Sequence, residues 1–159
     1  MMYRKIKKDE VPQLVNFTYL ALYVAPGQKA FDKDIVYSPE ISKYYMDFDN
    51  ERELCFVCQI DEKLVGAVWG RQWLGDIQGY GFFSPQFLEL TISILPDYRG
   101  RGIGTKLLEL FISEVRRLEF KGLSLSVSHG NRAKNIYEKF GFKVVELRDD
   151  DILMVLPFK

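Results

Sequence analysis

The chain has 159 residues, 47% of them apolar and 14% aromatic, which excludes a disordered chain and is enough for one compact domain. Its 22 basic and 22 acidic residues balance, so no net charge attracts the protein to nucleic acid or to an anionic membrane. No segment is apolar enough to span a membrane and the opening MMYRKIKKDE lacks the apolar core of a signal peptide, so we expect a cytoplasmic protein.

The first half of the chain predicts a strand, two helices and a hairpin. A strand at residues 2–6 precedes a helix capped by Asp9, whose inward positions recur at helical spacing: Val11, Leu14, Val15, Thr18 and Leu22. After a loop at 24–37, Ser38-Pro39 predicts the start of a second helix. Its inner face carries Ile41, Tyr44, Tyr45 and Phe48. Residues 54–60 and 64–73 are strand-like runs joined by a polar turn, which predicts a hairpin.

The first of these two strands contains a C-x-x-C sequence, Cys55 and Cys58, which raises the possibility of a redox pair or half a zinc site. Residues three apart on a strand face opposite sides of the sheet. There is no second cysteine pair, and His129 is the only histidine. We therefore interpret both cysteines as reduced core residues and predict no metal site.

The second half alternates strands and helices. A glycine-rich aromatic loop at 74–86 leads to a strand at 87–95, a long helix after the glycine run, a strand at 123–127, a helix from Asn131 to Gly141 and two closing strands at 142–147 and 152–158. The inward positions of the long helix are Ile103, Leu107, Leu110, Phe111, Val115 and Leu118, and those of the last helix are Ala133, Ile136, Tyr137 and Phe140. The order predicts one α/β domain over residues 1–159, with a mixed central sheet of about seven strands flanked by about four helices. Residues 87–127 should form a parallel β-α-β unit with a right-handed crossover.

Three glycines stand at alternate positions where the long helix begins, Gly100, Gly102 and Gly104. The N-terminus of a helix favours anions, and glycines let the main chain approach a phosphate closely. The P-loop pattern fails because Thr105 occupies the place of its second glycine, and the dinucleotide pattern G-x-G-x-x-G fails at the same residue.

The pattern that remains, [QR]-x-x-G-x-[GA], is met from Arg99 to Gly104. Together with ISILPDYRGRGIGTKLL and NRAKNIYEKFGF, it resembles the GNAT superfamily of N-acetyltransferases, which bind acetyl-CoA. The resemblance covers most of the chain but is weak between residues 24 and 86. It implies the acyl-CoA N-acyltransferase fold, with a sheet that opens beside the strand at 87–95 to admit the pantetheine arm. The cofactor-binding residues that it implies are Ile92, Ser93 and Ile94 on that strand, then Arg99, Gly100, Arg101, Gly102, Ile103, Gly104 and Thr105 around the pyrophosphate, and Asn131.

The resemblance also implies the catalytic residues. Tyr137 matches the family tyrosine that acts as general acid toward the departing thiolate, although its helical spacing also fits a core tyrosine with a satisfied hydroxyl. Glu89 is the candidate base, acting directly or through water. It should share a strand face with Thr91 and Ser93, and an ordinary salt-bridged glutamate is the alternative.

The acceptor is expected to be a primary amine, with a small molecule favoured over a protein. Its pocket should lie between residues 24–50 and 74–86, where aromatic and acidic side chains are frequent: Tyr37, Tyr44, Tyr45, Trp69, Trp73, Tyr80 and Phe82, with Asp32, Asp34 and Asp76. The alternative function is a non-catalytic acyl-CoA-binding sensor or regulatory module. A homodimer is also expected, with residues 152–158 as a possible intermolecular sheet edge.

Overall fold

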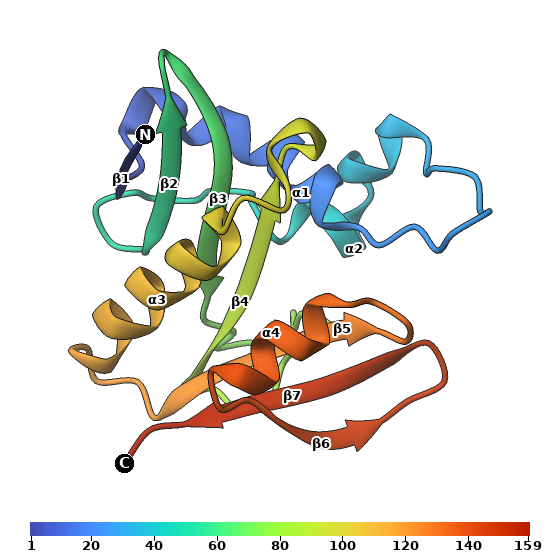
Figure 1. The fold of residues 1–159 in the computed structure, drawn as a ribbon. Helices are drawn as coiled ribbons and strands as arrows, with labels where there is room; N and C mark the ends of the chain where they lie inside the picture. Colours follow the sequence, from blue (N-terminus) through green and yellow to red (C-terminus); the bar gives the residue numbers. More distant parts are fainter.

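The computed structural model describes residues 1–159 and contains one seven-stranded sheet with helices on both faces (Figure 1). The strands are β1 (Met2–Lys5), β2 (Cys55–Ile60), β3 (Lys63–Arg71), β4 (Phe87–Ile94), β5 (Gly122–Ser128), β6 (Lys143–Leu147) and β7 (Asp151–Pro157). The α-helices are α1 (Leu14–Ala21), α2 (Pro39–Ser42), α3 (Ile103–Arg116) and α4 (Ala133–Lys139), and short 3-10 helices span Lys8–Gln13, Lys33–Tyr37 and Pro96–Tyr98. The predicted order of strands and helices is confirmed.

The sheet has the strand order β1-β2-β3-β4-β5-β7-β6, and β4 and β5 are its only parallel pair. This pair is in register for only three positions, where Phe87, Leu88 and Glu89 face Gly122, Leu123 and Ser124. Beyond them the two strands diverge, as Figure 1 shows. The sheet is therefore open on one side of β4 from Leu90 onward, as the resemblance implied.

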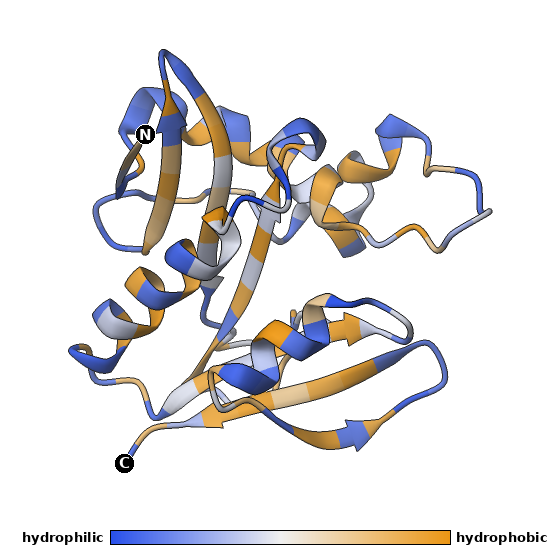
Figure 2. Ribbon diagram, viewed as in Figure 1, coloured by the Kyte–Doolittle hydropathy of each residue, from blue (hydrophilic) through white to orange (hydrophobic).

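Two apolar clusters cover the two faces of the sheet. The larger joins α3 and α4 to the sheet through residues such as Leu88, Phe111 and Tyr137. The smaller joins α1 to β2 and β3, with Phe17 and Trp69 fully buried. The ribbon coloured by hydropathy shows the alternation of apolar and polar positions along α3 (Figure 2). The apolar face predicted for α3 is therefore the face that packs against the sheet.

The two cysteines behave as predicted. Cys55 belongs to the cluster on the α1 side, whereas Cys58 belongs to the cluster on the α3 side. Both thiols are free and buried, and burial raises the pKa of Cys55 well above its ordinary value. They lie on opposite faces of β2, so the C-x-x-C sequence forms no pair.

Several local predictions were wrong. The first helical segment begins as a 3-10 helix capped at Lys7, which places Asp9 in its first turn instead of at the cap. The helix at Ser38-Pro39 ends after four residues, because the chain turns at Lys43 to bring Tyr44 toward the sheet. Leu118 lies beyond the end of α3 and is 43% exposed, so it does not belong to the inner face.

The last strand is not an edge of the sheet. β7 pairs with β5 on one side and with β6 on the other, and its residues Ile152 to Leu156 are buried. Figure 2 shows it apolar along most of its length, as expected for a strand with a neighbour on each side. Residues 152–158 therefore cannot form the intermolecular sheet edge that the sequence suggested. No helix is both long and apolar enough to cross a membrane.

Candidate functional site

The predicted phosphate loop presents a row of free main-chain donors. Gly100 and Gly102 have φ of 78° and 81°, in the left-handed region that favours glycine, and a Cβ on either would meet open space. None of the six backbone N–H groups of residues 100–105 donates a hydrogen bond to the protein, whereas the next one, on Lys106, bonds to Gly102. These six donors lie at the N-terminus of α3, a 14-residue helix whose dipole favours an anion there.

The side chains around this loop differ in how available they are. Arg99 donates through Nε to the carbonyl of Ile94, at the end of β4, and its side chain is exposed. The guanidinium of Arg101 donates to the carbonyl of Asp97 and lies 5.0 Å from the ring centre of Tyr98. Thr105 is exposed at the first turn of α3. The main chain therefore supplies most of the free donors, and Arg99 is the arginine that borders the gap.

The open side of β4 leads from this loop into the sheet. Leu95 donates to Val65 on β3, and Gly70, opposite Leu90, donates away from β4 to Leu54. Because alternate residues of a strand point their main-chain groups to opposite sides, those of Ile92 and Ile94 face the gap between β4 and β5. The main chain of Ser93 faces β3 instead, and its hydroxyl donates to the carbonyl of Phe17 at 2.6 Å. Ile92 and the N–H of Ile94 can therefore pair with an extended ligand, whereas the carbonyl of Ile94 already accepts from Arg99 and Ser93 is engaged.

Asn131 lies just before α4, where the resemblance implied a cofactor contact. Its side-chain oxygen accepts a hydrogen bond from the N–H of Ala133 at 3.0 Å, so it caps the segment that leads into the helix. Across the open end of the gap, the hydroxyl of Tyr23 donates to the carbonyl of Gly130 at 3.3 Å. This contact connects the end of α1 to the loop between β5 and α4.

Tyr137 projects from α4 into the apolar layer between the helices and the sheet, beside the ring of Phe142. It is 9% exposed, and burial raises the pKa of its phenol to about 12. Its hydroxyl makes no hydrogen bond to the protein. The hydroxyl oxygen is not fully enclosed. Tyr137 is therefore a residue of the apolar core whose hydroxyl has no partner in the protein, and the phenol keeps a proton to donate.

Glu89 is a buried carboxylate held by three neutral donors. The hydroxyl of Tyr44 and the N–H of Gly81 donate to Oε2 at 2.7 and 3.0 Å, and Nε1 of Trp73 donates to Oε1 at 2.7 Å. The side chain is 4% exposed and forms no salt bridge, so the alternative of a salt-bridged glutamate is wrong. Burial raises its pKa above the ordinary value, while the three donors and the charge of Lys43 act in the opposite direction.

The loop between β3 and β4 crosses directly over this carboxylate. We refer to its residues 78–81 as the strap. The strap is held through its main chain: Lys43 donates to the carbonyl of Gln78, Arg148 donates to that of Tyr80, and the N–H of Tyr80 donates to the hydroxyl of Tyr44. Two glycines permit this close approach. A Cβ on Gly79 would clash with Glu89, and one on Gly81 would lie 2.6 Å from the main-chain nitrogen of Ser126 on β5.

Glu89 and Tyr137 lie on opposite faces of the sheet. Leu88 and Leu90, the neighbours of Glu89 on β4, belong to the same apolar cluster as Tyr137, whereas Glu89 points to the side of Tyr44 and the strap. The gap between β4 and β5 opens immediately beyond Glu89. The phenol therefore lies on one side of the sheet and the carboxylate on the other, where Gly81 of the strap covers it.

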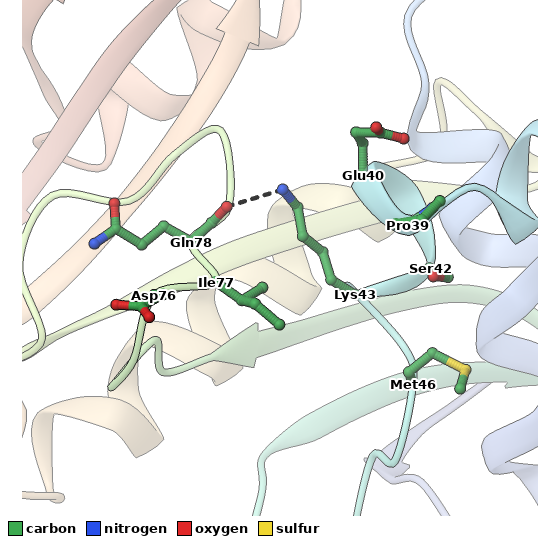
Figure 3. Close-up of a pocket in the computed structure, with 8 residues that line it drawn as sticks. All are labelled: Pro39, Glu40, Ser42, Lys43, Met46, Asp76, Ile77 and Gln78. Carbon is green, nitrogen blue, oxygen red and sulfur yellow. Dashed lines mark hydrogen bonds between the residues drawn. The ribbon is translucent and has the colours of Figure 1, made fainter.

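A groove lies on the outer side of the strap, between α2 and the loop (Figure 3). It has a volume of about 490 Å³. Its lining mixes charged, polar and apolar side chains: Pro39, Glu40, Ser42, Lys43, Met46, Asp76, Ile77 and Gln78. Figure 3 shows the ammonium of Lys43 reaching across the groove to Gln78, with a distance of 2.8 Å to its carbonyl.

Only part of the predicted acceptor pocket is brought together here. Asp76 lines the groove, Tyr44 and Trp73 bond to Glu89 behind the strap, and Tyr80 belongs to the strap itself. Trp69 is fully buried and donates to the carbonyl of Tyr44, so it belongs to the core. Asp32 is the cap of a short 3-10 helix, where it accepts from the N–H of Asp34.

All the lining residues fall within the predicted ranges 24–50 and 74–86, but the sequence did not single out Glu40, Lys43, Met46 and Ile77 among them. These positions lie on short elements without a clear periodicity. Gly79 and Gly81, two glycines within an aromatic loop, were the one available signal of a close main-chain approach. No three His, Cys, Asp or Glu side chains are placed to hold a metal ion.

Comparison with known proteins identifies relatives for most of the chain. The family model described as Acetyltransferase (GNAT) family matches residues 18–142. "Probable N-acetyltransferase camello" of Xenopus tropicalis is 38% identical over 106 residues, which are 65% of this chain and 44% of that protein. An N-alpha-acetyltransferase of Sulfurisphaera tokodaii is 28% identical over 169 aligned positions, covering 97% of this chain and 91% of the relative.

The fold agrees with these matches. A GNAT family acetyltransferase from Brucella melitensis, solved in complex with acetyl-CoA, superposes with a TM-score of 0.63 at 21% identity, covering 99% of this chain and 88% of that one. Three of the curated relatives are longer proteins, and the chain spans 44%, 61% and 42% of their lengths.

Proposed function

Because the chain belongs to the acetyltransferase (GNAT) family, we propose that it is an acetyl-CoA-dependent N-acetyltransferase. In this proposal residues 1–159 form a single catalytic domain that transfers the acetyl group directly from the thioester to a primary amine, with both substrates bound together. The observation that supports the proposal is the open side of β4, which runs from six free N–H groups at α3 to Leu90, the residue after Glu89.

The loop and strand supply the cofactor site. The N–H groups of residues 100–105 are arranged to bind the pyrophosphate of acetyl-CoA, with Arg99 and Arg101 adding positive charge beside them. Ile92 and Ile94 offer main-chain groups to the amides of the pantetheine arm, as a neighbouring strand would. When bound, acetyl-CoA supplies an activated acetyl group as a thioester. Ser93 and Asn131 support this site mainly by holding β4 and the start of α4.

Two proton transfers complete the proposed reaction. The amine loses a proton as its nitrogen attacks, and Glu89 is the base that takes it, either directly or through a water molecule. The departing sulfur gains a proton from the phenol of Tyr137. With its pKa raised to about 12, this phenol is protonated at any physiological pH, which is the state that a general acid must start from.

For the acceptor we propose a small-molecule amine that binds in the groove beside α2. The groove volume of about 490 Å³ is within the range of small-molecule sites, roughly 300–1,000 Å³. A polypeptide N-terminus is the alternative acceptor, because the Sulfurisphaera tokodaii relative bears the name N-alpha-acetyltransferase. Testing small amines and short peptides side by side as acetyl acceptors distinguishes these two classes of acceptor.

The experiment that tests the proposal has two stages. Calorimetric titration with acetyl-CoA should show micromolar binding that depends on the pantetheine arm, with adenine nucleotides as the control. Release of free thiol in the presence of amines then measures turnover. Binding without turnover on any amine would support the second candidate, a non-catalytic acyl-CoA-binding sensor or regulatory module, and the absence of binding would refute both.

A cytoplasmic location and a homodimer remain predictions from the sequence. β6, not β7, is the free edge of the sheet at this end, so an intermolecular strand contact would use β6. Measurement of the mass in solution tests the dimer, and fractionation of the host cell tests the location.

A further inference from the structure

We propose that Tyr44 is a positioning residue, whose single hydroxyl both orients the carboxylate of Glu89 and fixes the strap above it. The catalytic part of this inference rests on the proposed function, because it takes Glu89 as the base. The structural part concerns the coupling between Tyr44, Glu89 and Tyr80, and it can be tested without any turnover.

The geometry shows one hydroxyl that links three separate segments. Tyr44 follows α2, Glu89 lies on β4 and Tyr80 lies in the loop between β3 and β4. The Tyr44 hydroxyl donates to Glu89 Oε2 and accepts from the N–H of Tyr80, and both distances are 2.7 Å. A hydroxyl is suited to this place because it donates and accepts at the same time.

The ring of Tyr44 is itself held in place. It lies edge-on to the ring of Trp73, with the ring centres 5.7 Å apart, and the main-chain carbonyl of Tyr44 accepts from Nε1 of Trp69 at 2.9 Å. Tyr44 is 8% exposed. Its hydroxyl therefore has little freedom to turn away from Glu89, which is the condition for a positioning role.

The charged groups near Glu89 do not bond to its carboxylate, so the three neutral donors are what holds the carboxylate in place. Lys43 acts on it only from a distance, because its ammonium bonds to the carbonyl of Gln78. Arg71 is the cross-strand partner of Glu89, but its guanidinium pairs with Glu53 and lies over the ring of Phe48.

The remaining neighbours of Glu89 are Tyr80 in the strap and Ser124 on β5. Tyr80 reaches the site through its main-chain N–H, and its ring lies near Lys43. Ser124 pairs with Glu89 across the sheet, but its hydroxyl has no partner. Neither group places a charge on Glu89, so Lys43, which does not bond to the carboxylate, is the cation that remains to act on it when the Tyr44 donor is lost.

The consequence of Tyr44→Phe follows from these contacts. The ionised carboxylate loses one of its three donors, which favours the protonated form and raises the pKa of Glu89. The N–H of Tyr80 loses its acceptor, so the strap should open more often and the Tyr80 amide should exchange faster with solvent. If Glu89 is the base, the acid limb of the kcat/KM profile moves upward with the pKa.

The test compares three single variants of the full chain by NMR. Carboxyl carbon signals of labelled glutamate are titrated with pH, and Glu89→Gln identifies the signal of Glu89. Tyr44→Phe should raise its midpoint by about one pH unit and increase Tyr80 amide exchange at least tenfold. Trp73→Phe, which removes the donor to Oε1 and keeps an aromatic ring beside Tyr44, should raise the midpoint and change that exchange less than Tyr44→Phe does. Tyr45→Phe is the matched control, because its hydroxyl donates to the carbonyl of Val36, and it should change neither.

The outcomes decide the inference separately from the function. A Tyr44→Phe protein with an unchanged Glu89 midpoint, or with unchanged Tyr80 exchange, would overturn the positioning role even if the enzyme turns over normally. The expected pattern in the three variants would establish that role even if no amine were acetylated. In an active enzyme, the acid limb of the rate should shift with Tyr44→Phe and stay in place with Tyr45→Phe.

Discussion

Glu89 on β4 and Ser124 on β5 are paired across the sheet at the last position where these two strands are in register. The carboxylate of Glu89 accepts three hydrogen bonds, whereas the hydroxyl of Ser124, equally buried, has none. Beyond this pair the strands separate and the gap begins. At the point where β4 and β5 separate, the buried side chain of Glu89 thus has hydrogen-bond partners, whereas that of Ser124 has none.

Ser124 and Ser93 should respond in opposite ways to replacement by alanine. Ser124→Ala removes a buried hydroxyl without a partner, so we expect stability to stay the same or to rise by up to ~1 kcal/mol. Ser93→Ala removes the bond to Phe17 and should cost about 1 kcal/mol. Denaturant unfolding of the two variants measures the difference. A loss of stability in Ser124→Ala equal to that in Ser93→Ala would show that Ser124 has a partner.

Replacement of Gly102, one of the two phosphate-loop glycines with positive φ, should weaken acetyl-CoA binding as well as lower the stability. Gly102→Ala forces an alanine to φ of about 81°, which costs roughly 1–2 kcal/mol and turns the neighbouring N–H groups away from the anion. We expect roughly tenfold weaker acetyl-CoA binding, a loss of about 1.4 kcal/mol. Gly27→Ala is the control, because Gly27 has φ of 82° in open space outside the loop. It should lose similar stability and bind acetyl-CoA normally.

Tyr137→Phe should separate chemistry from folding. Its hydroxyl bonds to no protein group, so the variant should unfold within ~0.5 kcal/mol of the wild type. Without the acid, kcat should fall roughly 100-fold or more, while acetyl-CoA affinity stays the same. Steady-state kinetics and calorimetry measure the two quantities. An unchanged kcat would remove Tyr137 from the reaction.

The pH dependence of the wild type offers a further check on Tyr137. A general acid must be protonated, and a phenol with a pKa of about 12 loses its proton only as the pH approaches that value. Tyr137 should therefore cause no decline in kcat between pH 7 and pH 10. A decline in that range that disappears in Tyr137→Phe would contradict the raised pKa.

Because the strap lies close to Glu89 and β5, alanine substitutions at two glycines of this loop should differ strongly in their effect on stability. Gly81→Ala places a methyl group against the main chain of β5 and against Glu89, so the strap must withdraw and its bond to Glu89 is lost. We expect a loss of about 2 kcal/mol in stability. Gly75→Ala, in the same loop, meets no atom within 4 Å and should be neutral. Equal unfolding midpoints for the two variants would mean that the strap does not lie against Glu89.

Much of this protein is readable from local sequence. The spacing of apolar residues in α3 predicted its buried face, and alternation along β4 placed Glu89 on the side opposite Leu88 and Leu90. The glycines before α3 predicted a main chain exposed for an anion, and residues 100–105 do present free N–H groups. These features depend on neighbours in the chain, so a short segment contains the information.

The surroundings of Glu89 could not be read in the same way. Its three donors come from Tyr44, Trp73 and Gly81, on segments that are irregular or lie outside the strands, and no periodic pattern relates them. β7 was mistaken for an edge for a related reason, since its apolar sequence does not say which strands flank it. By itself the sequence determined the order of elements and the main-chain loop for phosphate, because hydrophobic spacing and glycine conformation act locally. Only the tertiary structure decided that a strap covers the carboxylate and that β4 and β5 separate after three residues, because both depend on long-range packing.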